Sequence, residues 1–266
     1  FFFQAEDGIR YAQESRGLGD VYKRQFLIFL AVLWCFIRET RATCSATEPV
    51  LAGWKTALGD RSLLVFGLSN ILFTTYIAQL SSSMPLYFRN WVGIPEVQIG
   101  ILFALHGALI ALLQMPVARW LNRRTRVQGL QGSALMWGVG FLLVWLSGLA
   151  AGLGTVPALG MAALALMVLS LALVSYNPSA SALVADLAPD HLRGVYLSVN
   201  SLCWAAGFAV GPMIGGMALD LPQPWASGLW VFWVISVGLV LGILGFLNRI
   251  LPCQVNRSTA PLIVEP

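Results

Sequence analysis

The chain has 266 residues, of which 58% are hydrophobic and only 11% are charged, and its formal net charge is +4. Soluble domains carry about 25% charged residues, so this supply is too small to cover a globule of this size with a solvated surface. The composition therefore excludes an ordinary soluble enzyme, a disordered tail and a nucleic-acid binder. The four cysteines have no paired spacing and no CxxC motif, which predicts neither a disulfide framework nor a metal site.

The first 25 residues differ from the rest of the sequence. They are polar and mixed in charge, and they lack the order of a signal peptide, because their apolar residues come first and no small-residue cleavage site follows. The strings AEDGIR and GLGDVYKRQ resemble translated sequencing-adapter read-through. We therefore expect residues 1–25 to be a non-native leader, with a genuine cytoplasmic segment as the alternative.

Six later stretches are apolar enough for transmembrane helices, which need about 20 such residues each. We place them at about 62–84, 97–118, 128–150, 156–178, 195–217 and 226–248. The apolar run 26–37 is too short to span and is expected to be the end of a preceding helix. A polar connector, 38–61, and a short tail, 249–266, flank the six-helix block. The sequence thus predicts an all-α membrane protein, a six-helix transmembrane bundle.

The basic residues are sorted to one side of these spans. Outside the leader, eleven of the twelve Lys and Arg residues lie on one side, and only Arg89 lies on the other. Cytoplasmic loops carry the excess of Lys and Arg. We therefore expect both ends of the six-helix block, the connector and the tail to be cytoplasmic, with the protein in a bacterial inner membrane. Trp91, Trp225 and Trp230 are expected to anchor helices at the membrane interfaces.

Two motifs are more specific than hydropathy. The first is the basic loop QMPVARWLNRRTR, residues 114–126, between the second and third spans. It resembles the loop motif of the major facilitator superfamily, roughly G-x-x-x-D-R-x-G-R-R. Pro116 and Trp120 stand where the Gly and Asp of that pattern would fall, so only the basic part is kept. Four arginines carry it: Arg119, Arg123, Arg124 and Arg126.

The second motif is GFAVGPMIGG, residues 207–216, in the fifth span. It resembles the G-x-x-x-G-P-x-x-G-G motif of the proton-coupled exporters of the same superfamily. Glycines four residues apart let another helix approach closely, and a proline permits a kink. Simple helix packing is the alternative reading. The residues concerned are Gly207, Gly211, Pro212, Gly215 and Gly216.

A third segment, DLAPDHLRG at 186–194, resembles the corresponding cytoplasmic turn of the superfamily. Asp186 and Arg193 are expected to form an ion pair that holds an inner gate. The alternative is a solvated turn with a surface pair of little energetic value.

The resemblance covers residues 26–250 and implies a twelve-helix fold made of two halves. The partial span at 26–37, the connector at 38–61 and the short tail favour the C-terminal half. The block 62–248 would then be transmembrane helices 7–12, and residues 26–37 the end of helix 6. The implied partners are the lipid bilayer and a missing N-terminal half of the same chain.

By the same resemblance, helices 7, 8, 10 and 11 line a central cavity. Asn70 and Thr74 lie one turn apart on one helical face, and Gln79 is expected on roughly the opposite face. His106 is the only ionisable side chain at mid-membrane depth in these spans; it could serve a substrate or a proton, or be a neutral histidine bonded to a neighbouring helix. The other polar residues could equally join helices together. The candidate cavity residues are Asn70, Thr74, His106, Tyr176, Asn177, Asn200 and Trp204.

These patterns favour a secondary active transporter that exports small amphipathic compounds by alternating access, coupled to protons. Sparse amides, one imidazole and aromatic rings suit amphipathic molecules, whereas sugars would need more hydrogen-bonding groups. The alternatives are a sugar or metabolite facilitator, an intramembrane protease, or a membrane scaffold that does not transport. No nucleotide loop, metal cluster or nucleophile motif is visible in the sequence, so we expect no enzyme activity, no cofactor and no metal.

Overall fold

A computed structural model describes residues 50–222 and 225–256, together with Leu27, Phe29, Leu30 and Val32. The chain divides into two units, residues 1–47 and 48–266, and only the four residues just named are described in the first. The expected leader 1–25, most of the run 26–37, the first part of the connector and the end of the tail therefore lie outside the described residues.

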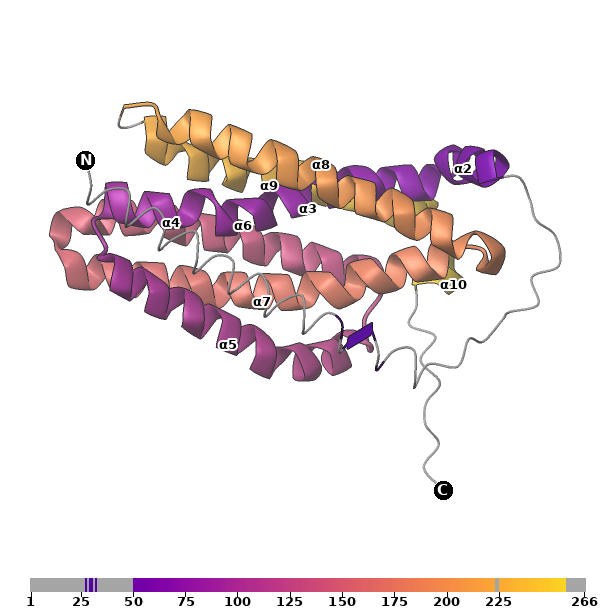
Figure 1. Cartoon of the computed structure of the whole chain (residues 1–266), viewed down its shortest axis with the longest axis horizontal. Coiled ribbons are helices and arrows are strands. Elements are labelled where there is room, and N and C mark those ends of the chain that lie inside the picture. Colours follow the sequence, from indigo (N-terminus) through magenta and orange to yellow (C-terminus); the bar gives the residue numbers. More distant parts are fainter. Residues whose placement is uncertain (1–26, 28, 31, 33–49, 223–224, 257–266) are drawn as a thin grey trace, which may run out of the picture. The chain divides into compact units, whose positions relative to one another are not determined.

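The second unit is built from helices (Figure 1). In chain order they are α2 (Val50–Gly59), α3 (Arg61–Ser81), α4 (Ser83–Tyr87), the π-helical turn η1 (Phe88–Val92), α5 (Glu96–Leu121), α6 (Arg126–Ala150), the 3-10 turn η2 (Ala151–Leu153), α7 (Thr155–Leu187), the 3-10 turn η3 (Asp190–Leu192), α8 (Arg193–Leu219), α9 (Trp225–Ile250) and α10 (Cys253–Asn256).

Six helices of the described part are long and apolar enough to cross a membrane: α3, α5, α6, α7, α8 and α9. The six predicted spans and the all-α fold are confirmed. The predicted end of the fourth span, at residue 178, is too early. Pro178 lies inside α7, and the helix continues to Leu187. The connector is also less irregular than its polarity indicates, because α2 forms within it.

Local sequence signals set the helix starts. The Asp60 carboxylate accepts hydrogen bonds from the backbone N–H groups of Ser62 (2.8 Å) and Leu63 (3.4 Å) at the start of α3. Thr125 and Gln128 form a reciprocal capping box at the start of α6. Gly93 adopts a positive φ of 76° between η1 and α5, which a glycine tolerates without strain. These caps satisfy N–H groups that have no partner within the helix.

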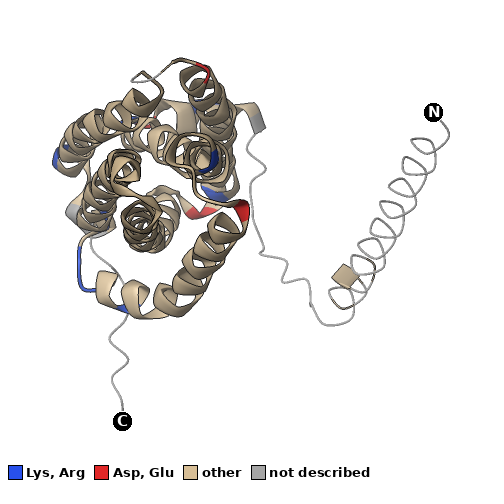
Figure 2. Cartoon of the chain, turned by 90° about the vertical axis from the view of Figure 1, so that its left-hand side faces the viewer, with Lys and Arg blue, Asp and Glu red and all other residues tan. Residues whose placement is uncertain are grey.

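The long helices lie side by side (Figure 1), with α3 the most buried and α5 the least. The most extensive contact joins α6 and α7; α3 packs on α8 and α9, α6 on α9, and α5 on α7. Charged residues of the described part lie at the helix ends and in the connections, as the colours in the view along the helices show (Figure 2). The long middle sections are free to face lipid or another helix.

An aromatic cluster fills the space between α3, α6 and α9. Tyr76 and Phe141 contact each other, and each also contacts Trp137 and Trp233, with ring centroids 5.3–6.5 Å apart. Trp230 packs on Phe141 at 5.9 Å and is fully buried. Its expected role as an interface anchor is therefore wrong: the side chain points into the bundle. Trp225, also expected at an interface, is 70% exposed.

Candidate functional site

A polar network joins three helices in the interior. Tyr176 of α7 donates a hydrogen bond from its hydroxyl to Oδ1 of Asn70 in α3. The Asn70 amide in turn donates to Oδ1 of Asn200 in α8, at 2.8 Å. Asn70 and Tyr176 are fully buried and Asn200 is half-buried. A buried amide is costly unless its hydrogen bonds are made, so each member stabilises the position of the others.

An aromatic strip borders this network. Tyr176 contacts Phe73 on one side and Trp204 on the other, with ring centroids 4.8 Å and 6.4 Å away. Trp204 stacks on Phe208 at 5.8 Å, and Phe208 is 40% exposed. The strip therefore runs from a buried amide–phenol network to an open face of α8. The network and the aromatic strip together offer flat apolar surface beside a few hydrogen-bonding groups, which is the usual composition of a site for an amphipathic small molecule.

The glycine motif packs α8 directly onto α3. A Cβ atom at Gly207 would overlap the Thr74 hydroxyl and lie 2.8 Å from the Thr75 backbone nitrogen. At Gly211 it would lie 2.6 Å from Ala78 Cβ, and at Gly215 it would overlap the Ser83 hydroxyl.

The remaining motif residues lie away from this contact. Pro212 and Gly216 are both exposed, and a Cβ at Gly216 would meet nothing within 4 Å. Three of the four glycines thus serve close helix packing.

Polar residues of α3 also face α8. Thr74 places its hydroxyl 2.9 Å from the Asn70 carbonyl and 3.3 Å from the Cys203 carbonyl. Gln79 donates to the Gly211 carbonyl at 2.6 Å. The expectation that Gln79 lies on the opposite face from Asn70 and Thr74 is therefore wrong. The glycines bring the two backbones so close that side chains from a wide sector of α3 contact α8. The long Gln79 side chain spans the remaining distance to the Gly211 carbonyl.

His106 makes a separate contact between α5 and α7. It is 7% exposed, and its Nδ1 lies 2.6 Å from Ser170 Oγ and 3.2 Å from the Leu166 carbonyl. The Ser170 hydroxyl also lies 2.7 Å from the same carbonyl. His106 does not enter the Asn70 network. Asn177 does not enter it either and lies exposed on α7.

The ion pairs at the helix ends differ from the expected one. Asp186 at the end of α7 pairs with Arg126 at the start of α6, at 3.3 Å. Arg193 pairs with Asp190, also at 3.3 Å, and both side chains are exposed. The expected Asp186–Arg193 pair is therefore wrong, because α6 packs along α7 and offers a nearer guanidinium. Both partners of the Arg126–Asp186 pair are largely buried.

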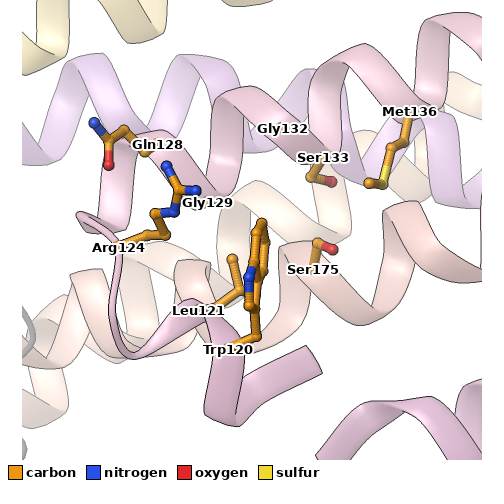
Figure 3. Close-up of a pocket in the computed structure, with 9 residues that line it drawn as sticks. All are labelled: Trp120, Leu121, Arg124, Gln128, Gly129, Gly132, Ser133, Met136 and Ser175. Carbon is orange, nitrogen blue, oxygen red and sulfur yellow. The ribbon is translucent and has the colours of Figure 1, made fainter. Parts of the chain in front are cut away.

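A cavity that the sequence did not indicate lies beside the basic loop. It has a volume of about 270 Å³ and opens between the end of α5, the first half of α6 and the middle of α7 (Figure 3). Its lining residues are Trp120, Leu121, Arg124, Gln128, Gly129, Gly132, Ser133, Met136 and Ser175. Within the described part of the chain, no group of three His, Cys, Asp or Glu side chains is placed to hold a metal ion.

Similarity to known proteins agrees with this architecture. Residues 67–262 match the model of the Major Facilitator Superfamily. Relatives include proteins named Multidrug resistance protein MdtH: one from Sodalis glossinidius (strain morsitans), 23% identical over 228 residues, and one from Edwardsiella ictaluri (strain 93-146), 27% identical over 230 residues. These alignments cover 83% and 84% of this chain but 51% and 52% of the relatives. A third, from Salmonella newport (strain SL254), is 26% identical over 221 residues, 82% of this chain and 51% of its own.

The six apolar helices and their packing define an integral membrane protein of the α-helical bundle class. Because the family model matches most of its length, the chain belongs to the major facilitator superfamily. The chain spans about half the length of the curated relatives that it matches.

Proposed function

We propose that this chain forms one half of a secondary transporter that exports small amphipathic compounds by alternating access, with proton coupling. Family membership supports the transporter class, and the relatives' printed name supports drug-like substrates. Coverage of about half of each relative supports a second half that completes the cavity. In this proposal α3 to α9 supply transmembrane helices 7–12 in a bacterial inner membrane, with both ends of the block cytoplasmic.

The Asn70–Tyr176–Asn200 network is the observation that carries the substrate class. It comes from three of the helices that line the cavity in this family's architecture, and the Trp204–Phe208 stack extends it to an open face of α8. A substrate with a flat apolar body would stack on these rings and exchange hydrogen bonds with the amides. Few such groups are present, which favours amphipathic molecules over sugars.

Proton coupling needs a group that changes charge. No Asp or Glu lies inside the predicted spans, and His106 is the one buried histidine of the described residues. We assign the proton-carrying role to His106 or to a carboxylate of the second half. Ionisable groups within a membrane are rare and usually functional, which supports His106.

The test begins with sequencing of the source locus upstream of codon 26, to recover the complete reading frame. The complete protein is then placed in everted vesicles, and pH-gradient-driven movement of an amphipathic fluorescent cation is measured. We expect Asn70→Ala and Tyr176→Phe to reduce kcat/KM for the cation about tenfold each, the loss of about one hydrogen bond to a buried group.

The matched control is Ser198→Ala, which removes an exposed hydroxyl bonded only to its own helix. Transport by both network variants at the wild-type rate would contradict the assignment of this site. Movement of the cation that ignores the pH gradient would contradict proton coupling. A reading frame that begins at residue 1 would require two copies of this chain in place of two halves.

A further inference from the structure

The cavity beside the basic loop has a polar end and an apolar end. Its floor is one face of α6, because Gly129, Gly132, Ser133 and Met136 follow the spacing of a single helical face. Arg124 and Gln128 lie at one end of it and Met136 at the other, with the Trp120 indole between them (Figure 3). The distance along α6 from Gln128 to Met136 is about 12 Å at 1.5 Å per residue.

The polar end carries an uncompensated positive charge. Arg124 is exposed, and its guanidinium lies 5.3 Å from the centroid of the Trp120 ring. Within the described residues it forms no ion pair, whereas Arg126 two positions later is neutralised by Asp186. Contact with a ring leaves the charge of Arg124 in place. An anion is therefore the complementary ligand at this end.

Apart from the Ser175 hydroxyl, the remaining surface of the cavity suits hydrocarbon. The Ser133 hydroxyl is occupied by the Ala172 carbonyl at 2.7 Å, so it does not demand a further partner. A Cβ atom at Gly132 would meet nothing within 4 Å, so the missing side chain leaves free volume there. Trp120 is 55% exposed, as is common for tryptophan at the level of lipid headgroups.

We propose that this cavity binds an anionic phospholipid, with the phosphate at Arg124 and Gln128 and the start of an acyl chain along Gly132 toward Met136. Basic pockets between transmembrane helices bind anionic headgroups in this way. A zwitterionic lipid would leave the Arg124 charge only partly compensated. A soluble anion would leave the apolar end of the cavity unused. This site is separate from the Asn70 network and does not depend on the proposed transport activity.

The test is native mass spectrometry of the purified 266-residue chain with equal amounts of phosphatidylglycerol and phosphatidylcholine. We expect wild-type chain to retain phosphatidylglycerol in preference to phosphatidylcholine. Arg124→Gln should lower the retained phosphatidylglycerol about fivefold, the effect of one basic residue near an anionic lipid. Arg123→Gln is the control, since Arg123 is exposed in the same loop but does not line the cavity. Equal losses from the two variants would show diffuse attraction to the loop and overturn the proposal.

A second variant tests the apolar part. Gly132→Leu should fill the free volume and lower phosphatidylglycerol retention to a similar extent, with unchanged far-UV circular dichroism. Gly160→Leu is its control, because Gly160 is an exposed helical glycine of α7, likewise with nothing within 4 Å of an added Cβ.

Retention unchanged by Gly132→Leu would place the lipid elsewhere and overturn the proposal. Displacement of phosphatidylglycerol by inorganic phosphate alone would show that a free anion suffices, and would also overturn it.

Discussion

The two sides of α3 are packed by different chemistry. Toward α8 the helix meets glycines, and its polar side chains reach carbonyl and amide groups of the neighbouring helix. Toward α6 and α9 it presents Tyr76 to a cluster of large rings. In lipid, helices associate through close packing and hydrogen bonds, because the solvent is as apolar as the side chains. The α3 helix thus meets α8 through close backbone packing with hydrogen bonds, and it meets α6 and α9 mainly through large rings.

The two sides differ in how well their polar groups are satisfied. On the side of α3 that faces the α8 glycines (the glycine side), the backbones are so close that short side chains reach hydrogen-bond partners. On the side of α3 that faces α6 and α9 (the aromatic side), large rings keep these two helices further from the α3 backbone. Four donors in or beside the cluster have no hydrogen-bond partner among the described residues: Tyr87 Oη, Trp137 Nε1, Trp230 Nε1 and Trp233 Nε1. On the side facing α8, one buried acceptor, Gln79 Oε1, likewise lacks a partner among these residues. The glycine side should therefore be sensitive to added atoms, and the aromatic side to removed ones.

The largest expected effect is the loss of a ring from the aromatic side. Trp137→Ala should lower the free energy of unfolding by about 3–5 kcal/mol, because a fully buried indole leaves a cavity that neighbouring rings cannot fill. Unfolding in mixed dodecylsulfate and dodecylmaltoside micelles measures it. Trp137→Phe is the control and should cost much less. A cost below 1 kcal/mol for the alanine variant would mean that the aromatic side is loosely packed.

Addition of one methyl group to the glycine side should have the next largest effect. Gly207→Ala should cost about 1–3 kcal/mol, because its Cβ would lie against the Thr75 backbone nitrogen, which cannot move without shifting α3. Gly216→Ala on the same helix has open space and should be neutral or slightly stabilising. The same unfolding assay compares them. Equal outcomes for the two variants would contradict the tight α3–α8 contact.

Two tyrosines of the aromatic side separate ring packing from hydrogen bonding. Tyr76 makes a hydrogen bond of 2.7 Å with Ser236, so Tyr76→Phe should cost about 1 kcal/mol. Burial raises the pKa of Tyr87 to about 12, so its phenol remains a neutral, unpartnered donor at pH 7. Tyr87→Phe should therefore be neutral or stabilising. If Tyr87→Phe destabilises as much as Tyr76→Phe, the Tyr87 hydroxyl does have a partner.

The smallest expected effect belongs to the Asn70–Asn200 hydrogen bond. A double-mutant cycle with Asn70→Ala and Asn200→Ala should give a coupling energy of about 0.6 kcal/mol, the usual size for such bonds between membrane helices. The measurement is again unfolding in mixed micelles, with Asn200→Ala and Ser198→Ala as an uncoupled reference pair. Zero coupling between the two asparagines would mean that their hydrogen bond adds nothing to the stability of the α3–α8 contact.

The sequence predicted the six spans well because hydropathy is a local property. The exception is the end of the fourth span. Small residues after Pro178 continue α7 as a helix to Leu187, where Asp186 pairs with Arg126 at the start of α6, and hydropathy alone does not indicate this extension. The close helix packing at the glycine motif could also be predicted, because the small residues that a close contact requires are themselves visible in the sequence.

Pairings between helices could not be predicted in the same way. Asn70, Tyr176 and Asn200 were all identified as candidate cavity residues, but their hydrogen bonds to one another depend on how three distant segments pack. The ion-pair partner of Asp186 and the helical face of Gln79 were mispredicted for the same reason. The cavity beside the basic loop could not be predicted, because a glycine next to free volume looks like any other glycine in the sequence.

The contacts between α3 and α8 also define a register. Both helices run in the same direction, as the first and fifth of six spans. Tyr196 donates to Asp60 at the start, Asn70 donates to Asn200 further along, and Gln79 donates to the Gly211 carbonyl near the far end. A slip of a single residue would break all three bonds and move the glycines off their counterparts. Sliding α3 along α8 would therefore break all three bonds at once, so we expect the two helices to behave as one rigid pair.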